Sequence, residues 1–124
     1  MIGILVVDDD RAKRHEIEDL IKIVLANRPH LPVDIRFAGS AEEAIGILTS
    51  EDIALLITDY ELPGLNGLEL IQQISDRVST KKILLSETPP SLQVRILGAE
   101  AGLEGIFRKP IRRKELKQIL LNLF

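Results

Sequence analysis

IALLITDYELPGLNG, residues 53–67, is the stretch that decides the fold of this chain. Residues 53–58 are apolar or small, the run ends abruptly on Asp59, and Leu62-Pro63-Gly64 then predicts a turn. A short apolar run without alternation predicts a strand that is covered on both faces, as in a parallel sheet. Ligands usually bind beyond the carboxyl ends of such strands. Asp59 is therefore the first candidate functional residue.

The other predicted elements follow from where short apolar runs give way to apolar residues at helical spacing. Further strands are expected at residues 2–7, 33–37, 83–85 and 106–107, and the polar alternation within 33–37 favours a sheet edge. Helices are expected from Arg11 to a point before Pro29, behind the capping-box pattern at Ser40, and at residues 68–78, 91–101 and 112–124. This alternation predicts the α/β class, with a doubly wound, five-stranded parallel sheet and right-handed crossovers.

Length and composition limit the class of protein. The 124 residues suit a single domain, expected to fill residues 1–124, and 45% hydrophobic with 28% charged residues indicates a globular chain. The absence of cysteine excludes a disulfide framework, a thiolate metal site and a cysteine nucleophile. A net charge of -3 gives no reason to expect direct nucleic-acid binding. The start, MIGILVVDDD, predicts neither a signal peptide nor a membrane span, so a cytoplasmic location without a membrane partner is expected.

Charged and hydroxyl side chains follow the predicted strands. They are Asp8 and Asp9 after the first strand, Asp59 after the third, Ser86 after the fourth and Lys109 after the fifth. In a doubly wound sheet these strand ends share one edge, so the side chains should converge. Three neighbouring carboxylates repel one another, and a hard divalent cation such as Mg²⁺ would compensate them. A lysine and a hydroxyl beside them would suit an incoming phosphoryl group.

The position of Asp59 makes it the candidate nucleophile. It stands alone on the central strand, whereas Asp8 and Asp9 form a pair that can share a cation. A carboxylate can accept a phosphoryl group as an acyl phosphate, and a metal would neutralise charge on the transferring oxygens. The residues themselves therefore predict a magnesium site with phosphoryl transfer to Asp59.

Four segments, taken in order along the whole chain, resemble the receiver domain of two-component response regulators. They are ILVVDDD, LLITDYELPGLNG, the strand that ends in Ser86, and FRKP. The resemblance implies a flavodoxin-like (βα)5 fold with three α/β/α layers. It also implies phosphorylation of Asp59 by a sensor histidine kinase or a phosphotransfer protein. A downstream effector domain or protein would then meet the last strand and helices, and homodimer formation stays open.

The same resemblance implies roles for individual residues. Mg²⁺ would be held by Asp9, Asp59 and the backbone carbonyl of Glu61, with Asp8 assisting through water. Ser86 matches the switch hydroxyl, Lys109 matches the lysine that pairs with the phosphoryl group, and Pro110 follows a bond that is commonly cis in this family. Two positions depart from the family pattern, because Ile106 replaces the aromatic switch residue and Glu87 replaces a small residue.

Three alternatives stay open at this level. The acids at residues 8–10 could be only helix caps, and Lys109 could belong to a solvated basic segment, residues 108–117, which could also be a docking surface. Glu87 and Ile106 motivate a pseudo-receiver that binds partners without phosphorylation. A magnesium-dependent phosphohydrolase would need Glu61 as a general acid. A phosphoacceptor switch that is not an enzyme in the turnover sense is the preferred hypothesis.

Overall fold

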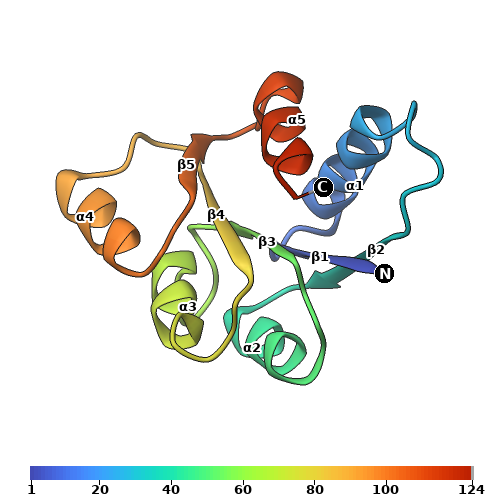
Figure 1. Ribbon diagram of the computed structural model, residues 1–124. Helices are drawn as coiled ribbons and strands as arrows, with labels where there is room; N and C mark the ends of the chain where they lie inside the picture. Colours follow the sequence, from blue (N-terminus) through green and yellow to red (C-terminus); the bar gives the residue numbers. More distant parts are fainter. Residues whose placement is uncertain (124) are drawn as a thin grey trace.

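The structure is a computed structural model that describes residues 1–123. Within these residues, five strands alternate with five helices (Figure 1). The strands are β1 (Ile2–Val7), β2 (Val33–Ala38), β3 (Leu55–Asp59), β4 (Lys81–Ser86) and β5 (Gly105–Arg108). The helices are α1 (Arg11–Val24), α2 (Ala41–Ser50), α3 (Gly67–Ile74), α4 (Leu92–Glu100) and α5 (Arg113–Leu121). Each predicted strand and helix is present.

The strands form one parallel sheet in the order β2-β1-β3-β4-β5, with helices on both faces. Figure 1 shows α1 and α5 on one side of the sheet and α2, α3 and α4 on the other. Alternate strand residues pack against the two helical layers: Ile4 and Val6 face α1 and α5, whereas Leu5 and Val7 face α2 and α3. This double coverage explains the uninterrupted apolar runs and confirms the predicted doubly wound, three-layer fold.

The sheet order places the candidate site at a topological switch point. From β1 the chain goes first to β2 on one side and then to β3 on the other, so the ends of β1 and β3 are neighbours with no crossover above them. Val7 is in register with Thr58, and Asp59 is in register with Leu85 of β4. The open crevice beyond the sheet therefore lies next to Asp59, as expected for ligand binding in this architecture.

A close approach of α3 to β3 requires glycine. The Gly67 amide donates to the Tyr60 carbonyl at 2.8 Å. A Cβ on Gly67 would collide with the Asp59 carbonyl oxygen and would lie 2.7 Å from Leu84 Cδ1. Gly67 thus lets α3 start directly behind the strand end that carries Asp59.

The helix caps agree with the sequence patterns except in one detail. Asp10 caps α1 by accepting from the Ala12 amide at 2.9 Å, and Ser40 caps α2 by accepting from the Glu43 amide at 3.2 Å. The reciprocal bond of the predicted capping box is different, because the Glu43 carboxylate accepts from Gly39 rather than from Ser40. A capping box that the sequence analysis did not predict joins Asn66 and Glu69 at the start of α3.

Several predicted boundaries were wrong by a few residues. α3 ends at Ile74 rather than near Val78, where turn bonds and the Ser75 hydroxyl, which donates to the Gln72 carbonyl, replace the helical pattern. β4 is longer than predicted because Lys81 and Lys82 pair with β3. The predicted end of the last helix, Phe124, lies outside the described residues.

Three further expectations are confirmed. β2 is an edge strand, the first helix starts at Arg11 and ends before Pro29, and the Lys109-Pro110 bond is cis. Among residues 1–123, no helix has the length and hydropathy needed to cross a membrane.

Candidate functional site

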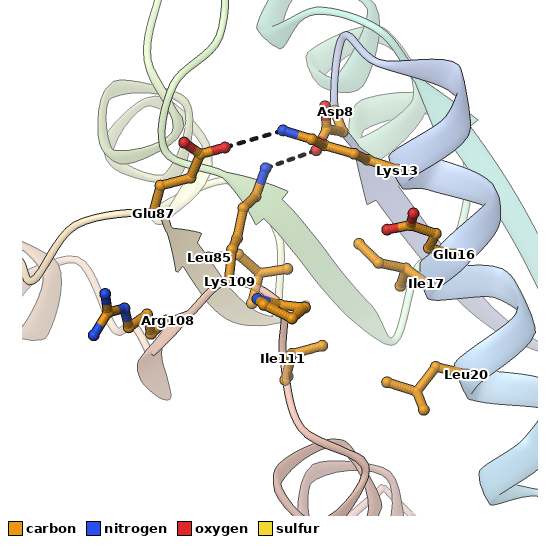
Figure 2. A pocket seen from close by; sticks show the side chains of 11 residues that line it. Asp8, Lys13, Glu16, Ile17, Leu20, Leu85, Glu87, Arg108, Lys109 and Ile111 are labelled. Carbon is orange, nitrogen blue, oxygen red and sulfur yellow. Dashed lines mark hydrogen bonds and ion pairs between the residues drawn. The ribbon is translucent and has the colours of Figure 1, made fainter.

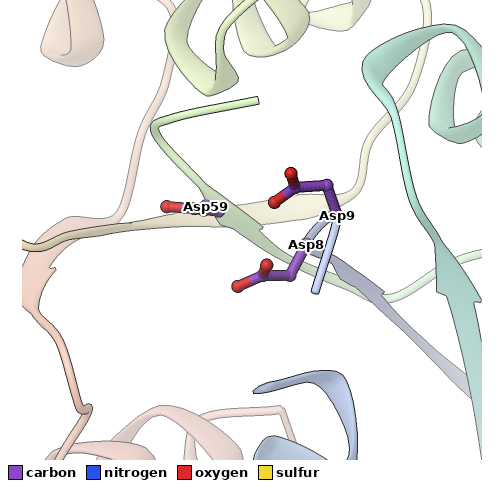
Figure 3. Close-up of side chains that lie close together, drawn as sticks. All are labelled: Asp8, Asp9 and Asp59. Atoms are coloured by element: carbon purple, nitrogen blue, oxygen red, sulfur yellow. The ribbon is translucent and has the colours of Figure 1, made fainter. Parts of the chain in front are cut away.

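Three aspartates meet at the carboxyl ends of β1 and β3. Asp8, Asp9 and Asp59 each place a carboxylate oxygen within 4.8 Å of the others (Figure 3). Asp8 and Asp59 are buried, with 1% and 6% of their surfaces exposed, whereas Asp9 is exposed. Such a group of hard oxygen donors, open to solvent on one side, fits a divalent cation that keeps some of its water.

Lys109 provides the positive charge inside this cluster. Its ammonium lies 2.8 Å from Asp8 Oδ2 and 3.0 Å from Asp59 Oδ2, and its side chain is only 11% exposed. Figure 2 shows the ammonium extending from the end of β5 toward Asp8. The Lys109 amide donates to the Ser86 carbonyl at 2.8 Å, which fixes the backbone at this point. Lys109 therefore bridges the first and third strands from the fifth.

The environment of Asp59 disfavours the ionised form of its carboxyl. Burial raises the pKa of Asp59 above its usual value of 3.8, and the nearby Asp8 charge raises it further. The ion pair with Lys109 and the hydrogen bond from the Glu61 amide oppose this shift without cancelling it. For Lys109, burial lowers the pKa, but the ion pairs with Asp8 and Asp59 outweigh burial and raise the pKa above 10.5. One ammonium thus compensates the cluster only in part, which leaves a need for a further cation.

Glu61 lies in the loop that follows β3. Its amide donates to Asp59 Oδ1 at 3.3 Å, and the residue lines a cavity together with Asp9 and Asp59. Its amide is therefore placed beside the acidic cluster, and the role of its backbone carbonyl as a metal ligand stays a prediction.

Ser86 lies at the end of β4, and its side-chain hydrogen bonds are with Thr88 rather than with the acids. It is 4% exposed, and its hydroxyl donates to the Thr88 carbonyl at 2.7 Å. It lines a separate cavity with Tyr60, Thr88 and Val94. The structure thus brings Asp8, Asp9, Asp59 and Lys109 together, whereas the Ser86 hydroxyl bonds within the β4–α4 loop.

Two residues near the site were missed by the sequence analysis. Lys13 pairs with Glu87 at 3.0 Å, and Arg14 Nη1 donates to the Asp8 carbonyl at 2.9 Å. A signal for both was present: the first turn of α1 has no acidic residue and is rich in basic ones, although the helix dipole favours the reverse. Cations at that position indicate partners close by, here the Glu87 carboxylate for Lys13 and the Asp8 backbone carbonyl for Arg14.

The fold and the site define a flavodoxin-like domain with an acidic cluster and a lysine at its topological switch point. Residues 4–121 match the family model described as response regulator receiver domain. The regulatory protein VanR of Enterococcus faecium is 33% identical over 113 residues, which are 91% of this chain and 46% of that protein. The response regulator MprA of Mycobacterium bovis is 31% identical over 115 residues, with coverage of 93% and 47%.

Solved structures agree with the family match. A receiver domain from Clostridium thermocellum has a TM-score of 0.82 and 25% identity, with 99% of this chain and 94% of that chain covered. A CheY-like receiver domain from Methanospirillum hungatei has a TM-score of 0.78, 28% identity and the same coverage. The chain belongs to the response regulator receiver domain family, a signalling module of two-component systems. It spans about half the length of the curated relatives described above, 46% and 47%.

Proposed function

We propose that this protein is a phosphoacceptor switch whose phosphorylation site is Asp59. The observation that carries the proposal is the position of Lys109, which reaches across the sheet edge to bind both Asp8 and Asp59 beside the carboxylate of Asp9. A structural lysine could be satisfied by one acid at the surface. A lysine buried between two carboxylates at a ligand-binding edge instead provides a fixed charge where phosphoryl oxygens would arrive.

The reaction is a transfer from a phosphohistidine donor. A carboxylate oxygen of Asp59 attacks phosphorus, the phosphorus–nitrogen bond breaks, and its electron pair remains on the donor imidazole, which takes up a proton. The product is an acyl phosphate on Asp59. Lys109 supports this transfer by exchanging its contact with Asp59 Oδ2 for the oxygens of the phosphoryl group, while Asp8 keeps it oriented.

Mg²⁺ is the proposed cofactor, and the donor set at the site suits it. Asp9, Asp59 and the Glu61 backbone carbonyl would hold the ion, with Asp8 assisting through water. When bound, it would neutralise charge on the transferring oxygens and help to hold the reacting groups in line. The raised pKa of Asp59 supports this proposal, because an additional cation would favour the ionised, nucleophilic form.

The conformational response is proposed to involve Ser86 and the β4–α4 loop. The Ser86 hydroxyl donates to the Thr88 carbonyl, so it must leave this carbonyl to donate to a phosphoryl oxygen. That exchange would move the loop and the start of α4. Ile106 packs in the core layer next to α4, so we expect packing, rather than an aromatic ring rotation, to carry the change to β5.

The wider assignment is also a proposal. Residues 1–124 would form one receiver domain in the cytoplasm, served by a sensor histidine kinase or phosphotransfer protein and read by an effector through β5 and its neighbouring helices. The basic residues between Arg108 and Lys117 would contribute to that docking surface, and a homodimer is a further candidate assembly. The domain would not act as a turnover enzyme.

The test is phosphorylation by acetyl phosphate with and without Mg²⁺, followed by intact-mass measurement. We expect a single Mg²⁺-dependent phosphoryl adduct, absent from Asp59→Asn. Asp10→Asn is the matched control, because asparagine also caps helices and Asp10 is outside the cluster, so its adduct should match that of the wild type. A folded protein that binds Mg²⁺ but gives no adduct would overturn the proposal in favour of a phosphorylation-independent interaction module. Continuous release of phosphate at high turnover would instead indicate a phosphohydrolase.

A further inference from the structure

An ion pair lies beside the acidic site. Lys13, in the first turn of α1, lies 3.0 Å from Glu87, in the loop after β4, although the two are 74 residues apart in the chain. Figure 2 shows this pair above the contact between Lys109 and Asp8. Both residues line the cavity that holds Asp9 and Asp59, and both also line the adjoining groove beside Lys109. An anionic donor bound in either space would therefore lie close to this pair.

The pair is placed to respond to the charge of the site. The hydrogen bond and charge of Lys13, together with the charge of Lys109, lower the pKa of the Glu87 carboxyl. The hydrogen bond and charge of Glu87, with smaller contributions from Asp8 and Asp10, raise the pKa of Lys13. The pKa of each side chain therefore depends both on its partner and on the charges of the acidic site.

The contact is also easily exchanged. The side chains of Lys13 and Glu87 are 42% and 56% exposed, and exposed ion pairs stabilise proteins only weakly because water and salt screen them. A phosphoryl group on Asp59 would add negative charge beneath the pair, which attracts the ammonium of Lys13 and repels the carboxylate of Glu87. The same geometry thus favours the pair before phosphorylation and disfavours it afterwards.

We propose that Lys13 and Glu87 form a charge gate over the phosphorylation site. Before phosphorylation, Glu87 forms an ion pair with Lys13, and its negative charge opposes the approach of anionic donors. After transfer, Lys13 leaves Glu87 and becomes a second ammonium ligand of the phosphoryl group, beside Lys109. This inference rests on phosphorylation of Asp59 and adds two positioning residues to that site.

The first test measures the rate of phosphorylation by acetyl phosphate in Mg²⁺ at low ionic strength. Glu87→Gln should react about threefold to tenfold faster than the wild type, because one repulsive charge is removed. Lys13→Gln should react slower by a similar factor, because Glu87 is then unpaired at the entrance. Both differences should shrink in 1 M salt, where the screening length is only about 3 Å.

A matched control is present on the same helix. Lys22 and Glu18 form a pair at 3.6 Å, with side chains 66% and 21% exposed, that does not line either cavity. Lys22→Gln and Glu18→Gln should therefore leave the rate unchanged. If the gate variants react at the rate of these controls, the gate is refuted while phosphorylation of Asp59 stands. If the wild type itself gives no adduct, the proposed function fails, and this inference fails with it.

The second test measures Mg²⁺ affinity and does not depend on phosphorylation. Tyr60 is the only tyrosine, the chain has no tryptophan, and Tyr60 follows Asp59 directly, so its fluorescence can report metal binding. Glu87→Gln should weaken Mg²⁺ binding about twofold to fivefold, and Lys13→Gln should strengthen it by a similar factor. Each variant therefore moves Mg²⁺ affinity and donor rate in opposite directions. A variant that lowers both the Mg²⁺ affinity and the phosphorylation rate would indicate local structural damage and would refute the proposed charge gate.

The exchange itself can be followed by the side-chain NMR signal of the Lys13 ammonium. Phosphorylation of the wild type should shift this signal, while the signal of Lys22 should stay in place. An unmoved Lys13 signal in a phosphorylated sample would refute the transfer of Lys13 to the phosphoryl group.

Discussion

Replacing Asp59 by asparagine should stabilise the metal-free fold. The side chain of Asp59 is buried near Asp8 and Asp9, and burial raises the pKa of its carboxyl, so its charged form is disfavoured in the folded state. Asparagine has nearly the same shape and can still accept a hydrogen bond from Lys109. The substitution therefore removes a costly charge while most of the packing is retained.

The size of the effect follows from the distances. At an effective dielectric constant of about 20, unit charges 3.0 Å apart attract by roughly 5.5 kcal/mol, as for Lys109 and Asp59. Unit charges 4.8 Å apart repel by roughly 3.5 kcal/mol, which is a lower bound for Asp8 and Asp59. The exposed Asp9 adds about 1 kcal/mol of repulsion. Because these terms nearly cancel, the cost of burying the charge decides the sign, and we expect a net stabilisation of about 1–2 kcal/mol.

Urea unfolding at pH 7 with a metal chelator measures this difference directly. Asp19→Asn, an exposed carboxylate on α1, is the matched control and should change the free energy of unfolding by less than about 0.5 kcal/mol. Mg²⁺ at about 100 times its dissociation constant should then stabilise the wild type by about 2.7 kcal/mol and Asp59→Asn by much less. A metal-free Asp59→Asn variant that is less stable than the wild type would refute the electrostatic reasoning.

Three further predictions concern the same elements. The stability gap between Asp59→Asn and the wild type should narrow in urea titrations as the pH falls from 7 toward 3.8, because an acid whose folded pKa is raised costs stability only while it is ionised. Without metal, Lys109→Met should lower the free energy of unfolding by about 3–5 kcal/mol, because the buried carboxylates of Asp8 and Asp59 lose their partner. This difference between the variant and the wild type should shrink as the pH rises above 10.5, because the wild-type ammonium then loses its proton. Gly67→Ala should cost about 1–3 kcal/mol in thermal unfolding, because the added Cβ meets the Asp59 carbonyl oxygen, whereas Gly46→Ala, with open space around its Cβ, should not destabilise α2.

The central sheet was predictable because its physical requirements are visible in the sequence. Leu55, Leu56 and Ile57 are fully buried, so only apolar residues are tolerated there, and the end of the run marks the end of the strand. Parallel topology then brings the strand ends together without further information. The contacts of Lys109 with Asp8 and Asp59 agree with that expectation.

The parts that could not be predicted depend on side-chain orientation and on competing local bonds. The sequence places Ser86 at a strand end, but its hydroxyl donates to Thr88 because that carbonyl is two residues away. Leu92 and Ile96 lie at helical spacing, yet they are 73% and 50% exposed, because α4 packs through other positions such as Gly98. The partner of Glu87 lies 74 residues away, and pairwise spacing alone does not identify it.

The ion pair between Lys109 and Asp8 also has a consequence for how the protein assembles. It joins residues 101 positions apart, so forming it closes a long loop and costs more chain entropy than a local contact would. When β1 and β3 pair before β5 has docked, the acids are brought together without their ammonium partner, and their repulsion opposes that intermediate. If β5 docks last, the charge balance of the cluster is completed only in that final step, and a chain that lacks β5 would hold the three acids without their lysine.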